Sequence, residues 1–346
     1  MGSMVFTLLV AGLSTSTIIT MSSHHWLLAW LGLELNTLCM LPLIFKKRHP
    51  RATEATTKYF LMQATAAAII LLASTLNAWQ TGQWNIMNTN SNMPIALLYA
   101  SLALKLGLAP AHLWYIEVLQ GTTTSTALII TTWQKIAPLT LIYMLHSHMH
   151  TNILLCLGLL STLTGAWTGL NQTQVRKVLA ASSIAHVGWI VTALALQQTL
   201  ATVTLIIYIT MTTSIFMTFI FSSTKTLQDM GTAWSTTPPL LASALMTLMS
   251  LGGLPPLTGF LPKWLILKEL TTSGFTPLST ALALSSLPAI YFYIRMAYIT
   301  MLTTPPNTTN TEQKWRFKSP NHMIAPLSLM LSMIMLPLTP LLYMTV

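Results

Sequence analysis

Long apolar stretches, separated by short polar linkers, follow one another along the whole chain. About 20 consecutive apolar residues cross the hydrocarbon core of a bilayer as an α-helix, and eleven stretches are close to that length or longer. The pattern therefore predicts an all-α polytopic membrane protein with about eleven transmembrane helices. The expected segments are residues 3–21, 26–45, 59–78, 94–119, 125–146, 152–170, 178–196, 201–222, 239–268, 277–301 and 323–343.

Composition supports the membrane class. Of the 346 residues, 53% are hydrophobic and 6% are charged, which leaves too little polar surface to cover a water-soluble globule. The net charge of +10 does not indicate nucleic-acid binding, because the basic residues gather in short loops between the apolar segments.

Basic residues also predict the orientation. Every Lys and Arg that lies in a loop follows an even-numbered segment, and loops that follow odd-numbered segments contain neither. By the positive-inside rule, the N-terminus and the even loops face the cytoplasm-like side, and the C-terminus faces the other side. The basic loop residues are Lys46, Lys47, Arg48, Arg51, Lys58, Arg176, Lys177, Lys225, Lys314, Arg316 and Lys318.

Segments four and nine are longer than a span needs and are interrupted by glycine and proline, at residues 105–110 and 253–263. Since proline lacks a backbone donor and clashes with the preceding turn, both helices should break at Gly-Leu-X-Pro. The breaks lie five segments apart, and a repeat with an odd period has its copies in opposite orientations. We therefore expect two inverted five-helix repeats, residues 1–150 and 151–303, and then a basic loop and one extra helix in residues 304–346.

Four ionisable residues lie inside the apolar segments: Glu34, Lys105, Lys135 and Lys263. A charge at this depth costs at least about 2.5–3.5 kcal/mol on insertion scales and usually marks an ion pathway. Glu34 must have a cationic partner or stay protonated, and Lys105 is the nearest candidate in depth. Lys135 can gain and lose a proton if that pair moves. The alternatives are a static Glu34–Lys105 ion pair and a Lys135 held permanently charged by helix-end carbonyls.

Lys263, His186 and His112 are further candidates for proton transfer. Lys263 follows the second break, where it is either the last proton carrier or a lysine whose head snorkels to an interface. His186 lies at the repeat position opposite Glu34, and a histidine ring titrates near neutral pH. A lone helical histidine is also a common hydrogen-bonded packing residue, and His112, after the first break, has the same two interpretations.

The sequence contains no Walker loop, Rossmann fingerprint or cysteine cluster, so we expect no cofactor and no electron transfer by this chain alone. His146, His148 and His150 alternate without a second ligand cluster, which favours an interfacial loop over a zinc site. We expect neither a metal nor a nucleic-acid partner.

Residues 23–37, 54–60 and 174–189 resemble the antiporter-like membrane subunits of respiratory complex I, the mitochondrial NADH:ubiquinone oxidoreductase. The wider family includes subunits of multisubunit Na⁺/H⁺ antiporters. The resemblance runs almost end to end. It implies a core membrane subunit that couples NADH-to-ubiquinone electron transfer to proton translocation across the mitochondrial inner membrane, with the N-terminus in the matrix and the C-terminus in the intermembrane space.

The resemblance also implies roles and partners. Glu34 and Lys105 would form a coupling pair, Lys135 would be the central carrier, and Lys263 would be a terminal carrier or gate, since other members have a glutamate there. The implied partners are lipids and neighbouring membrane subunits, both antiporter-like and small carboxylate-bearing. FMN, iron–sulfur clusters and ubiquinone are expected in other subunits of the complex.

Two rival functions stay open. One is a stand-alone cation/proton antiporter, although a sodium site needs several oxygen ligands and the sequence offers one central carboxylate and no intramembrane aspartate. The other is a structural membrane-arm spacer, whose buried charges only hold the complex together.

Overall fold

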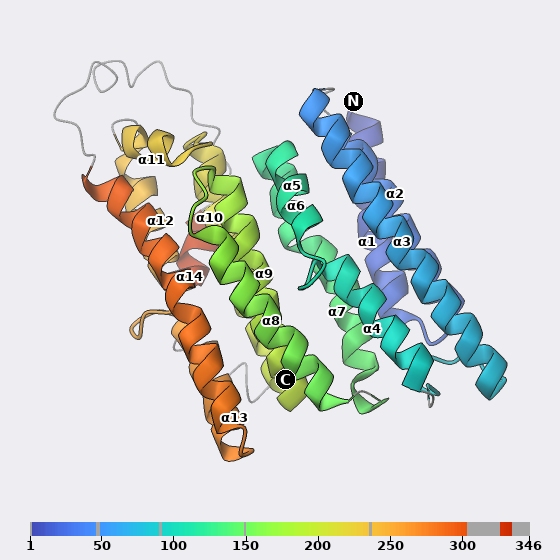
Figure 1. Cartoon of the computed structure of the whole chain (residues 1–346). Helices are drawn as coiled ribbons and strands as arrows, with labels where there is room; N and C mark the ends of the chain where they lie inside the picture. Colours follow the sequence, from blue (N-terminus) through green and yellow to red (C-terminus); the bar gives the residue numbers. More distant parts are fainter. Residues whose placement is uncertain are drawn as a thin grey trace. The chain divides into compact units, whose positions relative to one another are not determined.

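The computed structural model describes residues 2–45, 49–89, 92–148, 150–234, 237–302 and 326–333. Within these ranges every extended regular element is a helix, and β-pairing is limited to two isolated bridges, His25 with Asn85 and Gln174 with Thr226. The all-helical prediction is confirmed (Figure 1). Some predictions lie outside the described residues, namely those on Lys46, Lys47, Arg48, Lys314, Arg316, Lys318 and most of residues 323–343.

The chain divides into two compact units, Met1–Leu157 and Gly158–Val346. The first unit contains the N-terminal helices, two of which begin with a histidine cap: His25 Nδ1 accepts from the Leu27 N–H and His49 Nδ1 from the Arg51 N–H, both at 3.2 Å. Its helices are α1 Ser3–Ser22, α2 Trp26–Ile44, α3 Pro50–Thr81, α4 Asn92–Leu106, α5 Leu113–Gly121, α6 Thr124–Thr131, α7 Trp133–Met144 and the 3-10 turn η2 His146–His148.

Among the helices of the second unit that are long and apolar enough to cross a membrane, α9 is the most buried, with 94% of its most apolar stretch buried. It approaches α8 closely, because a Cβ atom on Gly165 would meet the Ala185 backbone nitrogen at 2.6 Å, and small residues permit such contact between membrane helices. The helices are α8 Thr151–Gly169, which begins in the first unit, α9 Val175–Leu196, α10 Gln198–Phe221, α11 Leu227–Ala233, α12 Pro238–Gly252, α13 Phe260–Thr272 and α14 Thr276–Leu302. Residues 326–333 are also helical.

Eight helices among the described residues are long and apolar enough to cross a membrane: α1, α2, α3, α6 with α7, α8, α9, α10 and α14. The predicted segments four and nine each appear as two shorter helices, α4 with α5 and α12 with α13. The chain therefore has an all-helical membrane architecture.

Both predicted helix breaks are confirmed, and both have the same geometry. Gly107 follows α4 with φ +71°, and Gly253 follows α12 with φ +82°. In each case the next residue bonds back across the end of the helix, Leu108 N–H to Ala103 O at 3.0 Å and Leu254 N–H to Met249 O at 3.4 Å. This is the Schellman arrangement, which requires a left-handed residue best supplied by glycine.

Two local features were not predicted. The fifth predicted segment is interrupted at Thr132, between α6 and α7. The loop after α10 contains α11, which begins with a capping box between Thr226 and Asp229. Burial by itself would raise the pKa of the Asp229 carboxyl. The carboxyl accepts hydrogen bonds from the backbone N–H groups of Thr226 and Lys225 and from the Thr226 hydroxyl, and it is attracted by the Lys225 charge. Together these interactions outweigh burial and lower the pKa below 3.8.

Candidate functional site

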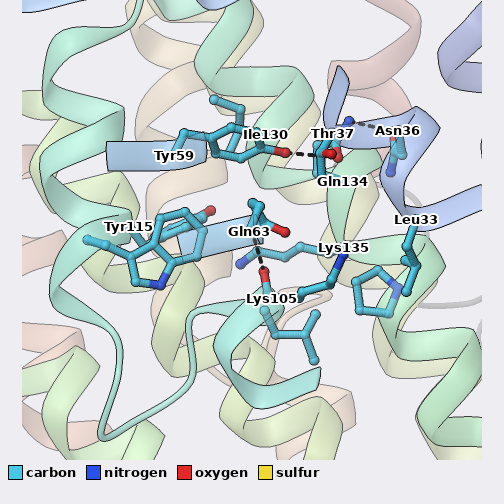
Figure 2. Close-up of a pocket in the computed structure, with 13 residues that line it drawn as sticks. Leu33, Asn36, Thr37, Tyr59, Gln63, Lys105, Tyr115, Ile130, Gln134 and Lys135 are labelled. Atoms are coloured by element: carbon cyan, nitrogen blue, oxygen red, sulfur yellow. Dashed lines mark hydrogen bonds between the residues drawn. The ribbon is translucent and has the colours of Figure 1, made fainter. Parts of the chain in front are cut away.

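Polar side chains from five helices meet in a buried pocket of the first unit (Figure 2). Lys105 and Lys135, two of the predicted site residues, both line it. The pocket is large enough to hold a water molecule. Its other polar lining residues are Asn36, Thr37, Tyr59, Gln63, Tyr115 and Gln134.

Lys105 lies in the last turn of α4, directly before the first break, and is only 6% exposed. Its Nζ is buried and has no hydrogen-bond partner among the described residues. Its backbone carbonyl accepts a hydrogen bond from Gln63 Nε2 at 3.4 Å. Burying an ammonium without a hydrogen bond costs folding free energy. Lys105 therefore destabilises the folded chain at this position.

Glu34 is half-buried on α2, and it reaches the pocket through Thr37. The Thr37 hydroxyl lies 3.2 Å from Glu34 Oε2 and 2.8 Å from the Glu34 carbonyl. In the described part of the chain no ion pair of 4.0 Å or less involves Glu34, although its charge acts on Lys105 electrostatically. Glu34 and Lys105 are thus within electrostatic reach of each other without a closed salt bridge.

Lys135 is 3% exposed on α7. Its Nζ lies 4.8 Å from the centre of the Tyr115 ring, a cation–π geometry worth about 2 kcal/mol when desolvated. The first helix break positions that ring, because Tyr115 lies in the first turn of α5 and its Cβ is 3.1 Å from where a Cβ atom on Gly107 would lie. The break therefore determines the surroundings of the lysine on α7.

A chain of uncharged polar groups surrounds the lysines, and the sequence analysis did not identify it. Gln134 Nε2 donates to Asn36 Oδ1 at 2.9 Å, and the Tyr59 hydroxyl donates to Gln134 Oε1 at 3.4 Å. Figure 2 shows Gln134 between these two partners. The sequence feature that could have identified Gln134 is an amide side chain within an apolar segment. Gln134, which directly precedes Lys135, thus links the helix of Lys135 to the helix of Glu34.

His112 lies between the two halves of the first broken helix, where it caps α5. Its Nδ1 is 3.1 Å from the Pro110 carbonyl, and it does not line the pocket of Lys105 and Lys135. The first unit therefore brings Lys105 and Lys135 together, with Glu34 next to them, and leaves His112 at the break.

Lys263 lies in the first turn of α13, and its Nζ donates to the Gly252 carbonyl at 2.8 Å. Gly252 is the last residue of α12, so the ammonium bridges the second break and binds the end of a helix that carries partial negative charge. Lys263 and His186 both line two cavities of the second unit. The second unit thus brings together the two candidates that it contains.

His186 has two aromatic neighbours that sequence analysis missed. Its Nε2 lies 3.3 Å from the Tyr293 hydroxyl, and its ring lies 5.8 Å from the Tyr208 ring.

Arg295 was also missed, although it is a charge within segment ten. Its Nη1 donates to the Leu170 carbonyl at 2.8 Å, a contact that secures the end of α8.

One charged cluster lies outside the buried sites. Lys58 Nζ contacts Glu54 Oε1 at 2.5 Å and Glu117 Oε2 at 2.6 Å, and all three side chains are more than a third exposed. The 32 residues of α3 extend about 48 Å, which exceeds the hydrocarbon core of about 30 Å. These charges therefore fit a helix end in the polar interface.

The sequence matches two protein-family models and is similar to known proteins along almost its whole length. Residues 23–287 match the family model described as NADH:quinone oxidoreductase/Mrp antiporter, and residues 290–343 match the model described as NADH dehydrogenase subunit 2 C-terminus. The NADH-ubiquinone oxidoreductase chain 2 of Tetraodon nigroviridis is 51% identical over 334 residues, which cover 96% of this chain and 95% of that relative.

Solved structures share the fold. A chain of respiratory complex I from Thermus thermophilus superposes with a TM-score of 0.84 at 26% identity, over 99% of this chain and 78% of that one. A chain of the Mrp complex from Dietzia superposes with a TM-score of 0.80 at 15% identity, over 97% of this chain and 76% of that one. The second likeness concerns the fold alone.

Proposed function

The chain belongs to the NADH:quinone oxidoreductase/Mrp antiporter family, among the NADH-ubiquinone oxidoreductase chain 2 proteins, and from this membership we propose that its buried lysines carry protons. It is an antiporter-like membrane subunit of complex I and thus part of a multi-subunit oxidoreductase. The proposal concerns which residues move protons and how their charges are coupled.

The observation that carries the proposal is the shared pocket of Lys105 and Lys135, which is buried and large enough for water. Glu34 acts on Lys105 across a gap that no salt bridge closes. A movement of Glu34 therefore changes the stabilisation of charge on Lys105, and a charged or neutral Lys105 in turn favours or disfavours a proton on Lys135.

The energies required are modest. Moving one charge against about 100 mV takes about 2.3 kcal/mol, and one pKa unit corresponds to about 1.36 kcal/mol. A change of about two pKa units in a carrier is therefore of the right size, and changes of that size are common when a buried group gains or loses a charged neighbour.

In the second unit His186 is the relay and Lys263 the terminal carrier or gate. The hydrogen bond from Lys263 to the Gly252 carbonyl favours this role over a snorkelling lysine, because the ammonium turns to the broken helix. His112 remains a candidate for proton transfer at the first break. Its half-buried ring beside the Pro110 carbonyl supports only an accessory role.

We also propose the full architecture: eleven transmembrane helices, in which residues 1–150 and 151–303 are inverted five-helix repeats and residues 304–346 add a basic loop and a last helix. The matching Schellman caps at Gly107 and Gly253 support the repeat.

The location is the mitochondrial inner membrane, with the N-terminus in the matrix and the C-terminus in the intermembrane space. Neighbouring antiporter-like and small carboxylate-bearing subunits extend the row of buried charges beyond this chain. FMN, iron–sulfur clusters and ubiquinone belong to other subunits.

The test is proton translocation per NADH oxidised in sealed vesicles that contain the intact complex with Lys135→Ala, normalised to assembled complex. Lys268→Ala is the matched control, since Lys268 is exposed. We expect Lys135→Ala to lower the ratio, or to stop turnover with normal assembly, while the control behaves as wild type. An unchanged ratio at normal turnover would favour the structural spacer. Cation exchange by the chain reconstituted alone would favour the stand-alone antiporter.

A further inference from the structure

Tyr293 is a buried phenol beside the second helix break. It lies on α14, is 1% exposed, and packs against the Phe292 ring at 4.5 Å between ring centres. A Cβ atom on Gly252 would lie 3.8 Å from the Tyr293 ring, and the Gly252 carbonyl is the one that Lys263 binds. Tyr293 and Lys263 therefore both adjoin the end of α12.

The Tyr293 hydroxyl faces α9. It lies 3.3 Å from His186 Nε2, and Ser182 lines the same cavity as Tyr293. Ser182 and His186 are four residues apart and thus share one face of that helix. A hydroxyl can accept one hydrogen bond while it donates another, so Tyr293 is suited to pass a proton along such a row.

A cavity joins this row to Lys263. Tyr293, His186, Ser182 and Lys263 all line it, and it is large enough for a water molecule. Ser285 lines it as well and donates to Thr162 Oγ1 at 3.2 Å. Hydroxyl groups therefore line the cavity that contains both the histidine and the lysine.

We propose that the Tyr293 hydroxyl relays protons between His186 and the cavity that contains Lys263. In the forward step His186 Nε2 gives its proton to the Tyr293 oxygen, while the phenolic proton leaves to a water in the cavity and from there to the neutral amine of Lys263. One O–H bond forms as another breaks, so Tyr293 returns to its starting state after its ring hydroxyl reorients. The inference rests on the proposed function of His186 and Lys263.

The alternative is a hydrogen bond that only positions the His186 ring. Loss of such a bond lowers stability and leaves protons per NADH unchanged. The two roles are therefore separated by a readout of proton movement and not by stability.

The test uses Tyr293→Phe in the intact complex, with Tyr291→Phe as the matched control. Tyr291 lies on the same helix and is 59% exposed, so the same atom is removed outside the cavity. We expect Tyr293→Phe to lower the protons translocated per NADH about tenfold at normal assembly, less than the hundredfold or more of a lost general acid or base, because water partly replaces the hydroxyl. Equal behaviour of the two variants would overturn the proposal.

Two further variants keep the outcome decisive. If Tyr293→Phe fails to assemble, Ser182→Ala removes the neighbouring hydroxyl that lines the same cavity, and unaltered pumping in that variant would overturn the relay. Lys263→Ala separates the inference from the function on which it rests. Loss of pumping in Lys263→Ala with normal pumping in Tyr293→Phe rejects the relay alone, whereas normal pumping in Lys263→Ala rejects the proposed role of the whole cavity.

Discussion

Lys105 shows the conflict between stability and function most plainly. Its ammonium is buried without a hydrogen-bond partner among the described residues, and nothing about helix packing requires a charge there. An apolar residue of the same length would fill the volume at lower cost. We interpret this position as one where a charge is kept because it must respond to Glu34.

The first prediction follows from that cost. Lys105→Met keeps the length and removes the charge, so the assembled complex should be as stable as wild type or more stable, by up to about 4 kcal/mol, while proton translocation is lost. Differential scanning calorimetry of the purified complex measures its stability, and protons translocated per NADH measure the pumping. Lys58→Met is the control, because exposed ion pairs contribute about 0–1 kcal/mol. A destabilised Lys105→Met complex that still pumps would contradict the interpretation.

The sequence made the charged candidates visible and left their uncharged neighbours hidden. Lys105, Lys135 and Lys263 were identifiable because a charge in an apolar segment is rare. Gln134 and Tyr293 were not, because uncharged polar side chains recur in the apolar segments of this chain and only the fold shows which of them face a lysine. Arg295 was overlooked although its charge was as visible as the others.

At the scale of elements, the helix breaks were predictable because their cause is local. Proline prevents continuation of the helix, and glycine supplies the left-handed turn that ends it. The interruption at Thr132 and the helix α11 were not predicted. The first has no nearby glycine, and the second is a helix of seven residues whose capping box lies in a polar loop.

The second broken helix yields the second prediction, Gly253→Ala. Gly253 has φ +82°, and an added Cβ would lie 2.8 Å from Lys263 Nζ, so the substitution strains the turn and displaces the ammonium from the Gly252 carbonyl. Gly274→Ala is the matched control, because Gly274 has φ +84° with nothing within 4 Å of its Cβ position. Both should lose about 1–2 kcal/mol of stability from the left-handed backbone.

Only Gly253→Ala should also impair proton translocation, measured per NADH at equal assembly. If both glycine variants pump alike, the contact between Lys263 and the end of α12 has no part in the mechanism. If neither loses stability, the left-handed turns are not strained by a side chain and the account of the breaks fails.

At the scale of the whole molecule, the two units contain matching parts: a broken helix, a lysine beside the break, and a buried polar pocket. The first unit adds a carboxylate, Glu34, and the second has a histidine, His186, at the corresponding position of the repeat that we propose. Because a nearby carboxylate changes the proton affinity of a lysine, we propose that the redox energy reaches this chain through Glu34 in the first unit. A spacer would have no need for this difference.

The most direct measurement is proton translocation per NADH with Glu34→Gln in the intact complex. The substitution keeps the shape of the side chain and an acceptor for the Thr37 hydroxyl, and removes only the charge. Glu54→Gln is the matched control, since Glu54 has a side chain that is 61% exposed. We expect Glu34→Gln to lose pumping to the level of Lys135→Ala while Glu54→Gln pumps as wild type. Normal pumping by an assembled Glu34→Gln complex would contradict the account.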